Sequence, residues 1–168
     1  MSLSLNMDIS VIEPLWSQIE ADLEAEFQRA LKALTEALGS PNAGELSVAL
    51  VSDAGIRALN KTYRGKDKAT NVLSFPAVGA APFLADGLAD IPPALLGDIV
   101  LAYETILREA EEKSVSVVAH CLHLFVHGFL HLRGFDHDTD QKAEKMESLE
   151  IAVLQGLGID NPYEINRP

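Results

Sequence analysis

The sequence predicts an α+β fold, with a small mixed four-stranded sheet packed with about five helices, and three observations support this class. Segments of β-forming composition alternate with helical segments in the first two thirds of the chain. The last third is helical throughout. Within it, residues 115–134 are apolar on nearly every side, which places that helix at the buried centre. With 168 residues, 48% of them hydrophobic, and no linker-like shift in composition, we expect one domain over residues 1–168.

The N-terminal segments predict a strand, a long helix and a second strand. "MDISVI", residues 7–12, alternates as a strand does, and Pro14 then suits the first turn of a helix. Apolar residues recur at helical spacing over 15–38, so one amphipathic helix is expected there, ended by "GSPNAG". "ELSVALVS", residues 45–52, is the next strand. Residues 1–6 are treated as a candidate disordered leader.

The middle of the chain predicts a helix between strands and then a long loop. "SDAGIRALNKTYRG", residues 52–65, offers an Asp or Ser N-cap, one apolar face and a C-terminal glycine. "TNVLSFP", residues 70–76, is a third strand. Residues 76–95 form a loop rich in Pro, Gly and Ala that carries no Lys or Arg. "LGDIVLA", residues 96–102, is mostly apolar and is predicted to be a central strand.

Three further helices are expected in the C-terminal part. A short charged helix covers residues 103–112, and the apolar helix covers 115–134. The last helix runs from about Asp138 to Gln155. Its inward face is formed by Met146, Leu149, Val153 and Leu157.

Charge and composition narrow the functional classes. The net charge of −12 argues against non-specific nucleic-acid binding. Five of the thirteen basic residues nevertheless fall within twelve positions, and this basic stripe could meet a phosphate backbone. Its members are Arg57, Lys61, Arg64, Lys66 and Lys68. No apolar run approaches the length of a membrane span, and no signal peptide is recognisable, so a cytoplasmic protein without a membrane partner is expected. Cys121, the single cysteine, is interpreted as a buried helix residue rather than a ligand.

"HGFLHLRGFDH", residues 127–137, has the spacing of a metal site. On a helix, His127 and His131 lie one turn apart and point the same way, as two ligands of one zinc ion require. Gly134 can end the helix in a left-handed conformation, so that His137 reaches the same ion. Three His ligands leave one coordination position open, which is typical of a catalytic rather than a structural zinc site.

The residue after the first histidine separates this pattern from the zinc proteases of the same spacing. Those enzymes carry a Glu there as general base, and this chain carries Gly128. Zinc alone lowers the pKa of a bound water to about 7, so that a hydroxide can form without the Glu. Phosphodiester chemistry is favoured over peptide hydrolysis, provided that cations stabilise the developing charge. The basic stripe could supply them.

Polar residues beside the three histidines have several possible roles. His123 lies four residues before His127 and could be a residue behind the ligands, a fourth ligand or a polar core residue; His120 is interpreted as structural. Asp136 and Asp138 flank His137, and one of them could orient a ligand imidazole through its other nitrogen. For Asp138, a solvated turn or a helix N-cap is the alternative.

"HLFVHGFLHLRGFDHD" resembles the H-x-x-x-H-x-x-G-[YF]-D-H motif of the bacterial YbeY family of rRNA maturation factors. Three further stretches agree in the same order: "LNKTYRGKDKATNVLSFP" at 59–76, "LGDIVLA" at 96–102, and "MESLE" in the last helix. The resemblance covers the chain from about residue 45 onward. It implies a zinc-dependent, single-strand-preferring endoribonuclease that acts in small-subunit rRNA 3′-end maturation and in ribosome quality control. It also implies a small mixed sheet packed with helices.

The resemblance also implies roles for individual residues. It makes His127, His131 and His137 the metal ligands, and Arg64 a functionally important arginine for which phosphate binding is a physical explanation. Lys61, Lys66 and Asn71 are candidates for substrate binding, and Asp136 is a candidate catalytic residue that would orient a ligand imidazole. His123 and Asp98 are candidates for residues behind the ligands. Asp98 could equally well face the substrate or be structural. Phe135 stands where tyrosine is common in the family, so a phenolic hydroxyl is not essential at that position.

One zinc ion is the expected cofactor, although imidazole ligands also suit nickel, copper and iron. The expected partners are single-stranded rRNA and the small ribosomal subunit. Because the chain is acidic, recruitment by a ribosomal protein or an assembly GTPase is a further hypothesis. Two alternatives stay open: a metallohydrolase of another substrate such as a peptide, and a non-catalytic ribosome-assembly factor with a structural metal.

Overall fold

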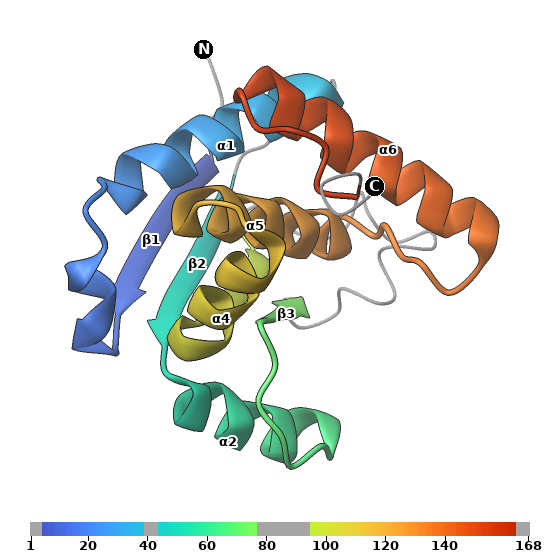
Figure 1. Cartoon of the computed structure of the whole chain (residues 1–168). Helices are drawn as coiled ribbons and strands as arrows, with labels where there is room; N and C mark the ends of the chain where they lie inside the picture. Colours follow the sequence, from blue (N-terminus) through green and yellow to red (C-terminus); the bar gives the residue numbers. More distant parts are fainter. Residues whose placement is uncertain (1–4, 39–43, 77–94, 164–168) are drawn as a thin grey trace.

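A mixed four-stranded sheet forms the centre of the fold in the computed structural model, which describes residues 5–38, 44–76 and 95–163 (Figure 1). The strands are β1 (Leu5–Val11), β2 (Gly44–Val51), β3 (Val72–Pro76) and β4 (Leu95–Ala102), in the order β1-β2-β4-β3. β1, β2 and β4 are parallel, whereas β3 runs antiparallel to β4 at one edge of the sheet. The predicted α+β class and the inner position of β4 are confirmed.

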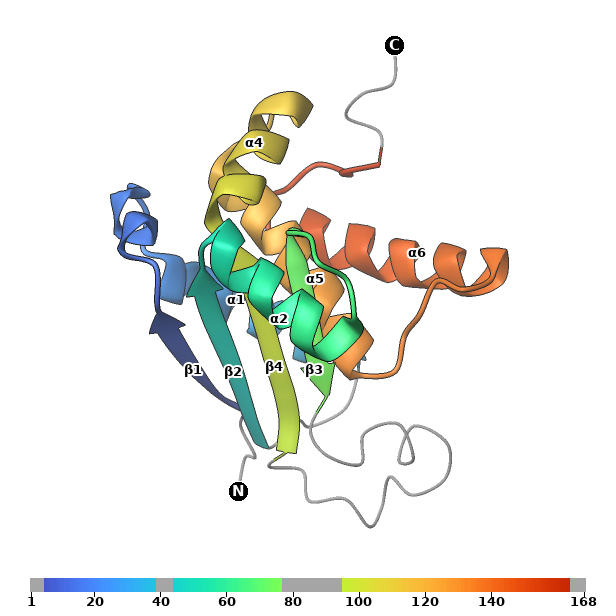
Figure 2. The same ribbon diagram turned by 90° about the horizontal axis from the view of Figure 1, so that it is seen from below.

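Helices cover both faces of this sheet. They are the short 3-10 helix η1 (Pro14–Gln18), α1 (Leu23–Leu38), α2 (Asp53–Arg64), α4 (Tyr103–Lys113), α5 (Val117–Leu132) and α6 (Asp140–Gly156). α2 lies against one face, over a small apolar cluster that includes Ile56 and Val100 (Figure 2). The other helices lie on the opposite side, where the larger core has formed. No single helix in the described ranges is long and apolar enough to cross a bilayer.

The segment expected to be one helix over 15–38 is two elements, so that prediction was wrong. The indole Nε1 of Trp16 donates a hydrogen bond to the Val51 carbonyl oxygen at 2.9 Å, which ties η1 to the end of β2. The backbone then becomes extended at Ile19, and the Asp22 carboxylate accepts a hydrogen bond from the Ala25 amide where α1 starts. Periodicity alone did not reveal the break, because both parts have apolar faces.

Three other boundaries differ from the sequence prediction or lie beyond what is described. β1 starts at Leu5, which pairs with Gly44, so residues 5 and 6 belong to the sheet and not to a leader. α6 takes Thr139 as its N-cap rather than Asp138, because the Thr139 hydroxyl accepts from the amide of the third helical residue. The predicted loop falls mainly on residues 77–94, outside the described residues.

α5 lies at the centre of the fold, as its apolar sequence predicted. It packs against α1, α4, α6, β3 and β4, and the rings of Phe125 and Phe129 are fully buried. The Ser116 hydroxyl caps its first turn by accepting from the Ala119 amide at 3.0 Å. At its other end Gly134 has a φ of +95°, the left-handed conformation that glycine adopts easily.

α5 lies close to the sheet at Gly128. The Ser74 hydroxyl of β3 donates a hydrogen bond to the Gly128 carbonyl oxygen at 3.0 Å. A Cβ atom on Gly128 would lie 3.0 Å from the Ser74 Oγ, 3.3 Å from the Ile99 Cγ2 and 3.4 Å from the Val72 Cγ2. Any side chain here would therefore need these neighbours to shift by a few tenths of an ångström. The position at which zinc proteases carry their general base is a close contact between helix and sheet in this fold.

We expect Gly128→Ala to lower the free energy of unfolding by about 1 kcal/mol, since overpacking costs about 1–3 kcal/mol and alanine recovers up to about 1 kcal/mol over glycine in a helix. Urea denaturation followed by circular dichroism measures this change. Gly156→Ala is the matched control, because a Cβ atom there meets nothing within 4 Å. If Gly128→Ala stabilised the protein as much as Gly156→Ala does, the close contact would not constrain the helix.

Candidate metal centre and its cleft

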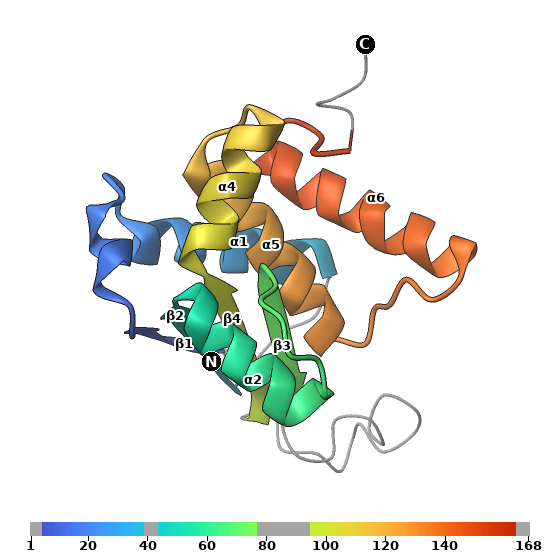
Figure 3. The ribbon, with the colours of Figure 1, turned by 60° about the horizontal axis from the view of Figure 1, so that its bottom comes forward.

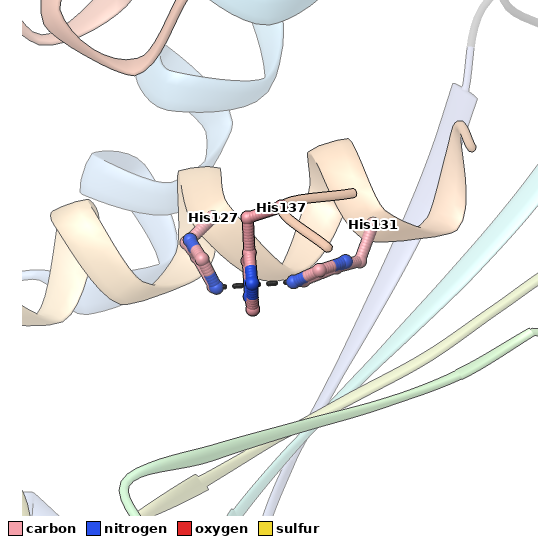
Figure 4. A group of neighbouring side chains, drawn as sticks. All are labelled: His127, His131 and His137. Carbon is pink, nitrogen blue, oxygen red and sulfur yellow. Dashed lines mark hydrogen bonds between the residues drawn. The ribbon is translucent and has the colours of Figure 1, made fainter. Parts of the chain in front are cut away.

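Three predicted histidines meet at the C-terminal end of α5. His127 and His131 lie one turn apart on the helix, and the turn at Gly134 brings His137 back toward them. Their ligand nitrogens all lie within 4.8 Å of one another, and the three rings point to a common centre (Figure 4). The two helical histidines face each other through Nε2 atoms 3.1 Å apart.

The geometry and protonation of this cluster fit a metal ion. At metal–nitrogen distances of 2.0–2.1 Å, tetrahedral ligands are about 3.4 Å apart, close to the 3.1 Å between His127 and His131. Burial lowers the pKa of His131, and the neighbouring His127 and His137 lower it further, while Asp136 and a backbone hydrogen bond to Phe135 oppose them. A lowered pKa keeps the imidazole neutral, which is the form that binds a metal.

A carboxylate that the sequence analysis did not assign lies directly behind the histidines. Glu150 of α6 is fully buried. Its Oε2 lies 3.2 Å from the Nδ1 of His127, and its Oε1 lies 2.8 Å from the Nε2 of His123. The hydroxyl of Tyr163 donates to Oε1 at 2.7 Å. Three donors thus surround one buried carboxylate.

These contacts decide which nitrogen of His127 is free to bind a metal. Burial raises the pKa of Glu150, but hydrogen bonds from His123, His127 and Tyr163 outweigh burial and lower it to about 2. The carboxylate is therefore ionised at neutral pH and can only accept hydrogen bonds. His127 accordingly carries its proton on Nδ1, and the lone pair of its Nε2 points to the other two histidines. A carboxylate behind a ligand histidine is the usual arrangement in metal sites.

Glu150 lies in the "MESLE" segment that was noted only for its resemblance to a family motif. A signal for it is present in the sequence. Met146, Glu150 and Val153 recur at helical spacing, so the carboxylate falls on the apolar face of α6, and all three are buried. A charge on the buried face of an amphipathic helix indicates a partner in the core.

His123 and His120 lie in the core on the same helix. His123 contacts Glu150 and is joined to His127 through that carboxylate, so it lies behind the ligands and not among them. Its Nδ1 has no hydrogen-bond partner within the described residues. His120 is buried and pairs with Glu109 at 2.8 Å.

The aspartates and the cysteine lie in different places. The Asp136 carboxylate accepts from the backbone amide of His137 at 2.7 Å, and so holds the turn that carries this histidine. Asp98 is exposed on β4, between Gly97 and Ile99, which face α5. Strand alternation therefore points Asp98 to the other face of the sheet, away from the histidines.

Cys121 is buried, and burial raises the pKa of its thiol to about 12, which disfavours a ligand role.

The histidines are among the residues that line a cleft of about 820 Å³. Much of its lining comes from α5, β3 and the end of α2, elements that lie side by side in the ribbon (Figure 3). The residues of this histidine cleft include four cations: Arg64, Lys66, Lys68 and Lys113. Asn71, His123 and Tyr163 also line it. Of the predicted basic stripe, Lys61 and Arg57 are not among the lining residues, and Arg57 pairs with Asp67 at 2.8 Å.

Arg64 is held in place at the mouth of this cleft. Its Nη2 donates to the Ser74 carbonyl oxygen at 2.6 Å, and its guanidinium carbon lies 5.1 Å from the centre of the Phe75 ring. Among the described residues, the Arg64 guanidinium makes one hydrogen bond out of the five N–H donors that it carries. The Asn71 amide nitrogen donates one of its two N–H groups to Glu109 at 2.9 Å.

A three-histidine cluster that could hold a metal ion, and that opens on a cation-lined cleft, is typical of the class of proteins with a catalytic metal centre. Residues 12–158 match the model of a family described as endoribonuclease YbeY, and the chain belongs to this YbeY family. The resemblance noted in the sequence is thereby confirmed. The family is one of metal-dependent nucleases, and the histidine cluster of this chain could bind such a metal.

Individual relatives support the assignment. The endoribonuclease YbeY of Bradyrhizobium diazoefficiens is 48% identical over 93% of this chain and 84% of its own length. That of Rhodopseudomonas palustris strain HaA2 is 50% identical over 86% of this chain and 74% of its own length. The solution structure of TM1509 from Thermotoga maritima has a TM-score of 0.56 at 23% identity, and covers 91% of this chain and 92% of that one. The last comparison shows that the fold is shared.

We expect His131→Ala to abolish stoichiometric metal binding, because two imidazoles remain at a site that offers three. Metal content after dialysis, measured by atomic emission, checks this result. His120→Ala is the matched control on the same helix, since His120 pairs with Glu109 away from the cluster. Retention of one metal ion by His131→Ala would show that the ion is bound elsewhere.

Proposed function

We propose that this chain is a zinc-dependent endoribonuclease that cleaves single-stranded rRNA in small-subunit 3′-end maturation and ribosome quality control, in the cytoplasm. One observation carries the proposal: three imidazoles converge beside a cleft with four cations in its walls. Membership of a family whose relatives are named endoribonucleases supports RNA as the substrate. The cations would attract the phosphate backbone, and the histidines would hold the metal beside it.

Zinc is the proposed ion because three neutral imidazoles and one open position suit it. When bound, it would act as a Lewis acid toward a phosphate oxygen and would acidify a bound water. Nickel, copper or iron could occupy the same ligands in a preparation. Glu150 accepts a hydrogen bond from the Nδ1 of His127 and so keeps the proton on that nitrogen, which leaves Nε2 to bind the metal. Glu150 would thereby support metal binding without touching the substrate.

Arg64 is the proposed phosphate-binding residue. Its contacts with Ser74 and Phe75 fix the guanidinium before the substrate arrives, so little side-chain entropy is lost on binding. Lys66 and Asn71 line the same cleft and would contact neighbouring nucleotides. Lys61 would reach only a more distant phosphate. Asp136 would act by holding the backbone of His137 in place.

The charge distribution supports recruitment by a partner on the small ribosomal subunit. The chain carries a net charge of −12, and only four cations line the cleft. Affinity for naked RNA should therefore be weak, with a log–log salt slope no steeper than about −3 at about −0.7 per phosphate contact. A ribosomal protein or an assembly GTPase would then supply the missing affinity. Tight, steeply salt-dependent binding to naked RNA would remove the need for such a partner.

A peptide is the second candidate substrate, because β3 is an edge strand and lines the cleft. An extended peptide can add to such an edge through backbone hydrogen bonds. The sequence opposes this reading, since Gly128 stands where such a protease carries its general base. Peptide hydrolysis that survives the loss of Arg64 would favour it over RNA cleavage.

We expect Arg64→Ala to keep metal and fold but to lose RNA cleavage, because the phosphate would lose its positioned cation. The assay follows a labelled single-stranded RNA, with and without chelator, and runs His131→Ala in parallel. Zinc should restore activity only to the chelated unchanged protein.

Lys32→Ala, on α1, is the control for simple loss of positive charge. If the unchanged protein, Arg64→Ala and His131→Ala all cut alike, the activity comes from a contaminant. If Arg64→Ala unfolds the protein, the role of this residue is structural.

A further inference from the structure

The chain beyond α6 reverses direction (Figure 1) and reaches the histidine cleft at Tyr163. Gly158 allows this turn with a φ of +82°. The amide of Ile159 then donates to the Leu154 carbonyl oxygen at 2.9 Å, and Arg29 of α1 donates to that of Leu157 at 3.4 Å. The start of segment 157–163 is thus tied to α6 and to α1.

Tyr163 is the residue by which this segment reaches the site. Its backbone amide donates to the Asn161 side-chain oxygen at 2.8 Å, which sets the direction of the chain. Its ring meets that of His123 edge-on, with centroids 5.5 Å apart. Its hydroxyl donates to the Oε1 of Glu150 at 2.7 Å. The ring also forms part of the cleft wall.

The Tyr163 hydroxyl helps to set which hydrogen-bond donors each carboxylate oxygen of Glu150 receives. Oε1 accepts from Tyr163 and from His123, so Oε2 is left for the Nδ1 of His127. A fully buried carboxylate is costly unless it is hydrogen-bonded, and each donor therefore matters. Without the hydroxyl, the carboxylate can turn toward its remaining donors and hold His127 less firmly.

We propose that Tyr163 is a positioning residue for the metal site: it fixes Glu150, and Glu150 fixes His127. Binding of a metal would then stabilise the packing of segment 157–163 against the site, and this packing would raise the metal affinity. The two effects are equal in free energy by thermodynamic linkage. The inference rests on the proposed metal site and not on RNA as the substrate.

Metal affinity tests the proposal directly. The zinc affinity of Tyr163→Phe, measured by competition with a chromophoric chelator, should be about tenfold weaker, the lower end of the effect of removing a partner behind a ligand. Tyr103→Phe is the matched control, since the Tyr103 ring packs on Trp16 far from the histidines, and it should bind zinc normally. Equal affinities of Tyr163→Phe and the unchanged protein would overturn the proposal.

A double-mutant cycle shows whether Tyr163 acts through Glu150. Glu150→Gln alone should weaken zinc binding by about 10- to 100-fold. Adding Tyr163→Phe to it should cost little more, because Glu150→Gln already removes the carboxylate through which Tyr163 is proposed to act. Losses that multiply would mean that Tyr163 acts by another route, and would overturn the proposal.

Hydrogen exchange tests the reciprocal effect on the segment itself. Zinc should slow amide exchange over residues 157–163 in the unchanged protein, and less so in Tyr163→Phe. His131→Ala controls for effects of zinc away from the site and should show no slowing. If zinc did not slow amide exchange over residues 157–163 of the wild-type sequence, the coupling would be contradicted. Neither readout uses RNA, so a failed cleavage assay and a failed coupling can be told apart.

Discussion

The contact between α5 and the sheet at Gly128 is the constraint on which the site depends. It lets the helix lie against β3 and β4 so closely that a Cβ atom would touch Ser74 and Ile99. The same contact places His127 and His131 above edge strand β3, so the strand and the histidines line one cleft. Gly128 also stands where a zinc protease carries its glutamate base. With a metal ion at the histidines, the remaining chemistry would come from cations and water.

Electrostatics divides the site into a buried half and an open half. Behind the histidines, the ionised Glu150 accepts hydrogen bonds from His123, His127 and Tyr163. In front of them lie the cations of the cleft, in a chain whose net charge is −12. The buried carboxylate favours a cation at the histidines, and the open side favours an anion. A metal ion bound to a phosphate satisfies both halves.

Much of this could be predicted from local sequence patterns. The spacing of His127, His131 and His137 predicted their convergence, because helical geometry and the turn at Gly134 fix it within eleven residues. Glu150 could not be placed in this way, since its contact with His127 spans 23 residues and depends on how α6 packs on α5. The break between η1 and α1 was missed for the same reason, because it depends on a Trp16 contact with β2, 35 residues away.

The most direct test of an open metal position beside an RNA-binding cleft is the visible spectrum of the cobalt(II)-substituted protein. A 2′-deoxy oligonucleotide, whose integrity would be checked on a gel, would be added while its binding is followed by fluorescence anisotropy. We predict that the cobalt d–d bands change as the oligonucleotide binds, because a phosphate oxygen enters the coordination shell, and that Arg64→Ala reduces this change. Saturable binding that leaves the spectrum unchanged would show that the metal is structural and that the cleft binds nucleic acid without it.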